Sequence, residues 1–246
     1  MKRRLRILFV FLCFLLLVSC GKMITKVAVS MFKHNNPHYF TNGNRKVIFI
    51  PMIHINKPEF YDEVKQFNDS LRNEGYVFFY EGVRWPKDID SLEQDTYKRK
   101  LRKVLGFNMS NYLDANNKDM KKYQIKGVVH QSPKNTGIDI EKDIRADYYI
   151  DSLIDRYEAD KGKLILDDYD KTASFTNKYK GKKVSSSDRD YLMLTLRNKY
   201  LADKVAGNSG DKIVILYGAF HRSGFLEELK LRDSSWKEVK RAEYIK

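Results

Sequence analysis

Two apolar segments separated by an amphipathic one constrain the fold of this chain more than any other feature. Residues 46–50 (KVIFI) are apolar and β-branched, as is typical of a strand buried on both faces, and residues 76–80 (YVFFY) have the same character. Between them, apolar residues recur at helical spacing, with Pro58 near the predicted helix start and Gly75 at its end. This order predicts a βαβ unit whose two strands point in the same direction.

A third apolar strand and further helices are predicted later in the chain. Residues 213–217 (IVILY) form a run of the same type, followed by a turn and a helix. Helical periodicity covers 91–106, 143–160 and 187–206, and QIKGVVHQS and TGIDI are candidate short strands. The sequence therefore predicts an α/β fold with a mostly parallel central sheet flanked by helices, formed by one domain over residues 44–246.

The amino-terminal residues have the features of a targeting segment. MKRRLRILFVFLCFLLLVSCGK begins with basic residues and continues with an apolar run, 7–18, that is too short to span a bilayer comfortably. The run ends in LVSC, which resembles a bacterial lipobox. We expect residues 1–19 to be a lipoprotein signal peptide and residues 20–43 to be a tether that starts at lipidated Cys20. The protein would then be lipid-anchored to a membrane of the cell envelope. An uncleaved membrane anchor is the alternative.

Charge and cysteine usage narrow the possible partners and chemistry. The net charge of +14 would indicate nucleic acid in a cytosolic protein. In an exported and tethered protein it favours an anionic membrane surface or envelope polymer, so we expect no nucleic-acid partner. A basic surface without a partner is the alternative. The only cysteines are Cys13 and Cys20, which leave no thiol for a disulfide, a metal or a nucleophile in the mature domain.

Three polar residues able to do chemistry follow the ends of the three predicted strands. His54 comes shortly after the first strand, Glu81 directly after the second, and His221 in GAFH after the third. Ligand sites of open α/β sheets form where parallel strands have their carboxyl ends. If all three strands are parallel, two histidines and one glutamate share this edge, and we predict a functional site there. For each histidine alone, a structural role in a turn is the alternative.

A late helix adds Arg197 and Asn198 to the candidates. Asn198 falls on the apolar stripe of its helix, and a buried amide or guanidinium needs partners, which a carboxylate such as Glu81 would provide. The alternative is that Asn198 bonds to local backbone while Arg197 extends to water. His130 and Asp139 also follow short apolar runs and are weaker candidates for the same cleft, although Asp139 alternatively caps the following helix.

Taken together, these motifs resemble the TraB/TIKI/GumN family, which is related to the erythromycin esterase and ChaN-like folds. The resemblance covers most of residues 44–246. That family has a strand ending in Gly-x-x-His, a glutamate after the next strand, an Arg-Asn pair on a late helix and a second Gly-x-x-His before the last helix. The matching segments here are PMIH with His54, YEG with Glu81, LRNKYLADKV with Arg197 and Asn198, and GAFH with Gly218 and His221.

The resemblance implies a TIKI/ChaN-like fold and a metal-dependent hydrolase of peptides or esters, with peptidase activity in the TIKI members. In this interpretation His54, Glu81 and His221 hold a divalent ion of the Mn, Co or Zn class, which lowers the pKa of bound water and polarises a carbonyl. Glu81 is a ligand or the general base. Arg197 steadies that carboxylate or a developing oxyanion, and Asn198 orients the ligands.

Two alternatives to this function stay open. Without a metal, His54 acts as a general base paired with Glu81, as in the esterase relatives. ChaN-like relatives are associated with haem binding, so a lipoprotein that binds haem or another ligand, without hydrolase activity, is the alternative from a different class. The sequence also departs from the family at Pro51, which replaces the glycine of the first motif. Because proline fixes φ and has no N–H, the turn that presents His54 is expected to differ.

Overall fold

The computed structural model describes residues 20–108 and 125–245, and over these ranges the protein is an α/β fold built on a mixed, mostly parallel sheet. The sheet has the strand order β6-β4-β7-β2-β1-β8. Its strands are β1 (His38–Thr41), β2 (Lys46–Met52), β4 (Val77–Tyr80), β6 (Ile144–Arg145), β7 (Lys212–Gly218) and β8 (Lys237–Val239). The strands β2, β7, β4 and the edge strand β6 are parallel, whereas β1 runs antiparallel to both of its neighbours.

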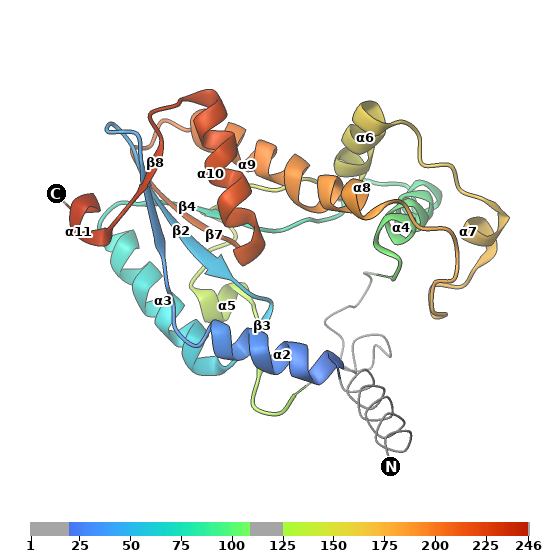
Figure 1. The fold of residues 1–246 in the computed structure, drawn as a ribbon, viewed down its shortest axis with the longest axis horizontal. Coiled ribbons are helices and arrows are strands. Elements are labelled where there is room, and N and C mark those ends of the chain that lie inside the picture. The colour runs from blue at the N-terminus through green and yellow to red at the C-terminus, as the bar shows by residue number, and fades with distance from the viewer. Residues whose placement is uncertain (1–19, 109–124, 246) are drawn as a thin grey trace, which may run out of the picture.

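Helices cover both faces of this sheet and extend beyond one side of it (Figure 1). Over the described ranges they are α2 (Cys20–Met31), α3 (Pro58–Asn73), α4 (Ser91–Leu105), α5 (Pro133–Thr136), α6 (Ile150–Lys161), α7 (Asp168–Thr172), α8 (Ser186–Asp190), α9 (Leu196–Ala206), α10 (Arg222–Arg232) and α11 (Arg241–Tyr244). A π-helical turn, η2 (Tyr191–Thr195), joins α8 to α9, and a 3-10 turn, η3 (Ala219–His221), joins β7 to α10. A small second sheet pairs β3 (Ile55–Asn56) with β5 (Val129–His130).

The alternation of side chains along the strands divides the core into two layers. Val47 and Phe49 point to the face covered by α9 and α10, while Ile48 and Ile50 point to the face covered by α3. All four side chains are at most 2% exposed. The continuous apolar character of residues 46–50 is therefore explained by burial on both faces, as expected for a central parallel strand.

A third apolar cluster lies to the side of the sheet and shapes the region next to the site. It joins α4, α6 and η2 through Leu101, Leu153, Leu192 and their neighbours. Figure 1 shows α4, α6 and α7 as a helical group set apart from the sheet, connected to it by the continuous run of α8, η2 and α9. The carboxyl edge of the sheet therefore faces a second packed body.

The predicted βαβ unit is confirmed, and so is the strand at residues 213–217. β2, α3, β4 and β7 all lie where the sequence places them, and β2, β4 and β7 are parallel. Two local predictions are wrong. TGIDI forms no strand, because Thr136 ends α5, whose amino-terminal cap is Ser132. The helix predicted over 143–160 begins only at Ile150, because the residues before it contain strand β6.

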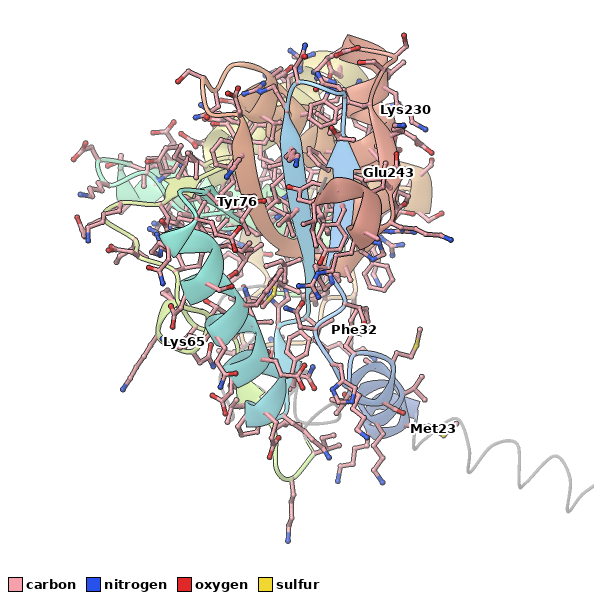
Figure 2. The ribbon with its side chains drawn as sticks, turned by 90° about the vertical axis from the view of Figure 1, so that its left-hand side faces the viewer. Met23, Phe32, Lys65, Tyr76, Lys230 and Glu243 are labelled. Carbon is pink, nitrogen blue, oxygen red and sulfur yellow. The ribbon has the colours of Figure 1, made fainter. Side chains whose placement is uncertain are left out.

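The segment predicted as a tether, residues 20–43, is folded over much of its length. Residues 20–31 form α2, with Thr25 and Val29 buried, and residues 38–41 form β1 inside the sheet. Phe32, at the end of α2, packs against the same core layer as α3 (Figure 2). The turn formers of this region only connect these elements, so the domain begins before residue 44. The predicted signal peptide, residues 1–19, lies outside the described residues. No described helix is long and apolar enough to cross a membrane.

Candidate functional site

The parallel strands bring the predicted site residues to one edge of the sheet. β2, β7 and β4 are neighbours that run in the same direction, and their carboxyl ends lead to His54, His221 and Glu81 respectively. Glu81 follows β4 directly, and its backbone N–H bonds to the carbonyl of Leu216 on β7. His221 is reached through η3 after the end of β7 at Gly218. The expectation that these three strand ends meet at one edge is thus confirmed.

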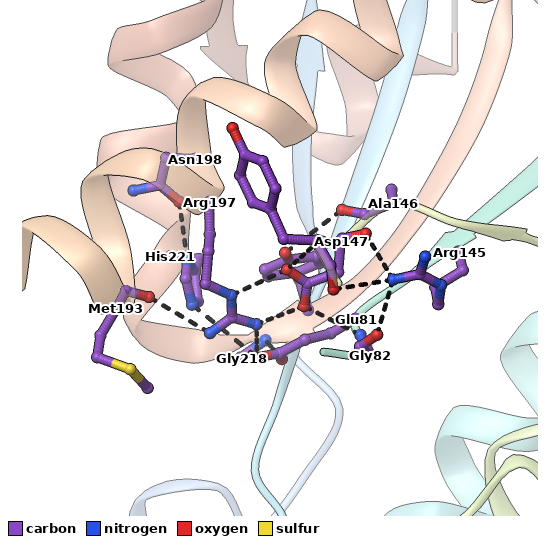
Figure 3. Close-up of polar contacts among 12 residues, drawn as sticks. Glu81, Gly82, Arg145, Ala146, Asp147, Met193, Arg197, Asn198, Gly218 and His221 are labelled. Atoms are coloured by element: carbon purple, nitrogen blue, oxygen red, sulfur yellow. Dashed lines mark hydrogen bonds and ion pairs between the residues drawn. The ribbon is translucent and has the colours of Figure 1, made fainter. Parts of the chain in front are cut away.

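Glu81 is held by a guanidinium and a backbone amide (Figure 3). Arg197 Nη2 donates to Glu81 Oε1 at 2.5 Å, and the Gly218 N–H donates to Oε2 at 2.6 Å. A β-carbon at residue 218 would lie 3.1 Å from Oε2, so glycine allows this close approach. Burial by itself would raise the pKa of Glu81, but the charge of Arg197, aided by the two histidines, outweighs it and lowers this pKa to about 2. Glu81 is therefore ionised at neutral pH.

Asp147, which the sequence analysis missed, is the second carboxylate of this network. It is fully buried and accepts from Arg197 at both oxygens, with 3.0 Å from Nε to Oδ1 and 2.6 Å from Nη2 to Oδ2. The backbone N–H groups of Gly82 and Tyr148 donate to the same two oxygens. Asp147 follows β6, so it is a fourth residue at the same strand edge. The two residues of β6 are too few to give a strand signal in the sequence.

Asn198 and His221 form a buried pair behind the carboxylates. Asn198 Oδ1 lies 2.8 Å from His221 Nδ1, which donates to it, so His221 Nε2 carries a lone pair. Burial, together with the charge of Arg197, lowers the pKa of His221 to about 4 against the opposing effect of Glu81 and Asp147. The imidazole is therefore neutral at pH 7. Its Nε2 faces Glu81 Oε1 across 4.0 Å, so two acceptors oppose each other.

The π-helical turn η2 immediately precedes the Arg-Asn pair. Its residue Met193 accepts from Arg197 Nη1 at 3.3 Å through its carbonyl. π-helical insertions of this kind are frequent at functional sites. With the bonds to Glu81 and Asp147, every nitrogen of the guanidinium has a partner. Arg197 is 4% exposed. Burial by itself would lower its pKa, but the electrostatic effects of Tyr217, Asp147 and Glu81 outweigh burial and raise it.

Pro51 fits its position in β2. β1 pairs with residues 46–49 of β2 and extends no further, whereas β7 pairs with β2 as far as Met52. At Pro51 the strand therefore has one neighbour fewer, which is where a sheet tolerates proline. His54 follows two residues after the strand ends, and its carbonyl accepts from the Gln131 N–H at 2.9 Å.

A cavity of about 590 Å³ opens at this edge of the sheet. Glu81, Arg197 and the exposed His54 line it, together with apolar residues of β4, α4 and α6. His221, Asn198 and Asp147 are buried and are not among the described residues that line it. His130 and Asp139 do not line it; Asp139 instead accepts from the backbone of Glu141 in a local turn. The volume is within the range of small-molecule sites.

Two side-chain atoms at this site have the chemistry of ligands for one metal ion. His221 Nε2 and Glu81 Oε1 are a neutral imidazole and a carboxylate that face each other, a pair that suits a first-row divalent ion. Asn198 fixes the imidazole in the way that outer-shell groups orient metal-binding histidines. Within the described ranges no three His, Cys, Asp or Glu residues are grouped closely enough to hold an ion. A third ligand would have to come from His54, on the exposed turn after β2.

Comparisons of this chain with protein-family models, with curated proteins and with solved structures find no match.

Proposed function

We propose that this protein is a hydrolase of peptides or esters whose reaction takes place where Glu81 and Arg197 line the cavity. The observation that carries the proposal is the pair of acceptors, His221 Nε2 and Glu81 Oε1, that face each other across 4.0 Å. Two buried lone pairs in this arrangement are stabilised by an electrophile or a hydrogen-bond donor between them. A water molecule and a metal ion both meet that requirement, and both are reactants or cofactors of hydrolysis.

The surrounding side chains fit distinct roles in such a reaction. His221 is neutral and oriented by Asn198, so its Nε2 is ready to accept a proton or a ligand bond. Glu81, with a pKa of about 2, is a poor proton acceptor at neutral pH and a good fixed negative charge. Its proposed role is therefore that of a ligand rather than of a general base. Arg197 steadies Glu81, and His54 faces the substrate from the exposed side of the cavity.

A divalent ion of the Mn, Co or Zn class is part of the proposal, with Glu81, His221 and His54 as the residues that would hold it. When bound, such an ion lowers the pKa of water and polarises a carbonyl. The metal-independent alternative uses His54 as the general base. Its exposure on the cavity wall supports access to a substrate.

The proposal includes membership of the TraB/TIKI/GumN group and a lipid anchor at Cys20. The order of strand, glutamate, Arg-Asn pair and Gly-x-x-His supports the first, because these residues converge on one network. The structure of α2 is consistent with the second. Met23, Val27 and Met31 recur every four residues along this helix and are more than half exposed, and the helix begins at Cys20.

A screen for hydrolysis with metal analysis tests this function. The purified protein is assayed on nitrophenyl esters and fluorogenic peptides, after chelation and after addition of Mn²⁺, Co²⁺ or Zn²⁺. We expect metal-dependent turnover that falls in Glu81→Gln, which keeps the shape of the side chain but removes its charge. Loss of metal together with turnover identifies Glu81 as a ligand; turnover after chelation supports His54 as the base. No turnover on any substrate or metal rejects the hydrolase.

Haem or ligand binding is the second candidate function, and the cavity favours it. A volume of about 590 Å³ with mostly apolar walls and an exposed histidine is compatible with a large aromatic ligand. Addition of haemin to the purified protein tests it. A shift of the Soret band at one equivalent, lost in His54→Ala or His221→Ala, together with an absence of hydrolysis, would favour a binding protein. The hydrolase predicts no such shift.

A further inference from the structure

The cations of α4 fall into two groups that differ in their partners. Three of them do not line the cavity and are paired with carboxylates: Arg99 with Asp95, Lys100 with Glu158, and Lys103 with Asp167 and Asp170. The remaining two, Lys98 and Arg102, are four residues apart and both line the cavity. Neither has an ion pair with a described carboxylate. Lys98 Nζ donates instead to the neutral Gln94 Oε1 at 3.0 Å.

Of these two residues, Arg102 is the stronger evidence for a bound ligand, because it is buried. Only 3% of the residue is exposed, yet its charge is balanced by no described carboxylate. Its terminal nitrogens donate to the carbonyls of Ala173 and Asn177, at 3.2 and 2.8 Å, while its Nε is a buried donor without a hydrogen-bond partner among the described residues. The rings of Phe175 and Tyr179 also lie against this guanidinium, with centroids 5.5 and 5.2 Å from its Cζ. Buried charges and buried donors in proteins normally have partners, so the Nε and the charge of Arg102 leave room for an anion at this cavity.

The other residues that line the cavity indicate what the rest of the ligand is like. Glu81 is the only carboxylate that lines the described part of the cavity, and Arg197 already balances it. Arg84 adds a further cation without an ion pair to a described carboxylate. Apolar side chains make up most of the remaining wall: Val83, Trp85, Leu101, Phe107, Ile150 and Leu153. Gln131, which also lines the cavity, has a buried acceptor, Oε1, without a hydrogen-bond partner among the described residues. This oxygen suits a hydrogen-bond donor on the ligand.

We propose that the cavity binds an amphipathic organic anion, whose acidic group is held by Arg102 and Lys98 and whose apolar body lies against α4 and α6. Only one part of this inference rests on the proposed function, namely that the bound anion is the substrate. Hydrolysis would then act on a carbonyl of a molecule that is anchored by its acidic group. The unpaired Nε of Arg102 supplies a charge-assisted hydrogen bond, which is stronger than a neutral one.

Two matched fluorescent probes test the inference. 8-Anilinonaphthalene-1-sulfonate and N-phenyl-1-naphthylamine share the same aromatic body and the same N–H, and only the first carries an anionic group. We expect the parent protein to bind the sulfonate more tightly by about tenfold or more in dissociation constant, the effect of one charge-assisted hydrogen bond. In Arg102→Met this preference should fall to about threefold or less, the share left to Lys98, while affinity for the neutral probe stays within about twofold.

Arg99→Met is a matched control. Arg99 lies one turn earlier on α4, donates to the same Ala173 carbonyl and stacks on the same Phe175 ring, but it is paired with Asp95 and does not line the cavity. A purely structural role for Arg102, in holding the segment around Ala173, would make the two variants behave alike. We expect Arg99→Met to keep the preference for the sulfonate.

Lys98→Met provides a second variant that does not depend on a buried residue, and it should reduce the preference by about threefold. Equal binding of the two probes by the parent protein would overturn the inference, and so would an unchanged preference in folded Arg102→Met. If Arg102→Met does not fold, the parent and Lys98→Met decide the question. Because the titration involves no turnover, a clear anion preference without hydrolysis would reject the proposed function and leave this inference standing.

Discussion

The burial of His221 predicts how the stability of this protein depends on pH. Its pKa is lowered from 6.5 to about 4 by burial and by Arg197, so the folded protein keeps the imidazole neutral where the unfolded chain takes up a proton. Because the folded-state pKa is depressed, this contribution to stability is fully present above pH 6.5 and is lost as the pH falls through about 4. The difference between the two pKa values corresponds to about 3 kcal/mol, of which about 2 kcal/mol is lost between pH 7 and pH 5.

Urea unfolding of the parent and of His221→Asn, at pH 7 and pH 5 in the presence of a chelator, measures this effect. Asparagine removes the titrating group and retains an amide nitrogen that can donate to Asn198. We expect the parent to lose about 2 kcal/mol more than the variant between the two pH values. His130→Asn removes an exposed histidine away from the cavity and should lose as much as the parent. Equal losses in the parent and His221→Asn would refute a neutral, buried His221.

Three further predictions concern other parts of the account. In Gly224→Ala the new β-carbon would overlap Asn198 Nδ2. Hydrolysis should therefore fall about tenfold, while the free energy of unfolding in urea falls by less than about 1 kcal/mol. Unchanged turnover would argue against an orienting role for the Asn198 amide. Asp147→Asn removes one of the two carboxylates that accept from Arg197 and leaves Glu81 as its partner, so it should destabilise the protein by about 1–3 kcal/mol. No measurable loss would mean that this pair is not needed. Cys20→Ala should block lipid attachment and processing; protein that remains in the membrane fraction at the mature size would reject the lipobox.

Much of the central fold can be predicted from the sequence, because β2, β4 and β7 are long, apolar and separated by recognisable helices. The direction of parallel strands then places Glu81 and the two histidines at one edge without any knowledge of side-chain contacts. Of the two alternatives for Arg197, water or a carboxylate such as Glu81, the structure has the contact with Glu81.

The remaining parts depend on tertiary contacts that leave little local pattern. β6 has two residues, and its neighbours Ala146 and Ile150 fall at helical spacing, so the sequence predicts a helix that includes Asp147. β1 is a short strand among turn-forming residues and is defined by its pairing with β2 and β8. Nor can the sequence show that Arg102 has no ion pair with a described carboxylate, because α4 is one of several basic segments and the carboxylates that pair with Lys100 and Lys103 are distant in the chain.

The measurement that tests the central claim most directly is a double-mutant cycle on hydrolysis. kcat/KM is compared for the parent, His54→Ala, His221→Ala and the double variant, on the ester or peptide that the screen identifies. If the two histidines and Glu81 act as one unit, each single change should lower kcat/KM about as far as the double change. Losses that multiply, or four proteins with the same kcat/KM, would contradict a single site at this edge of the sheet.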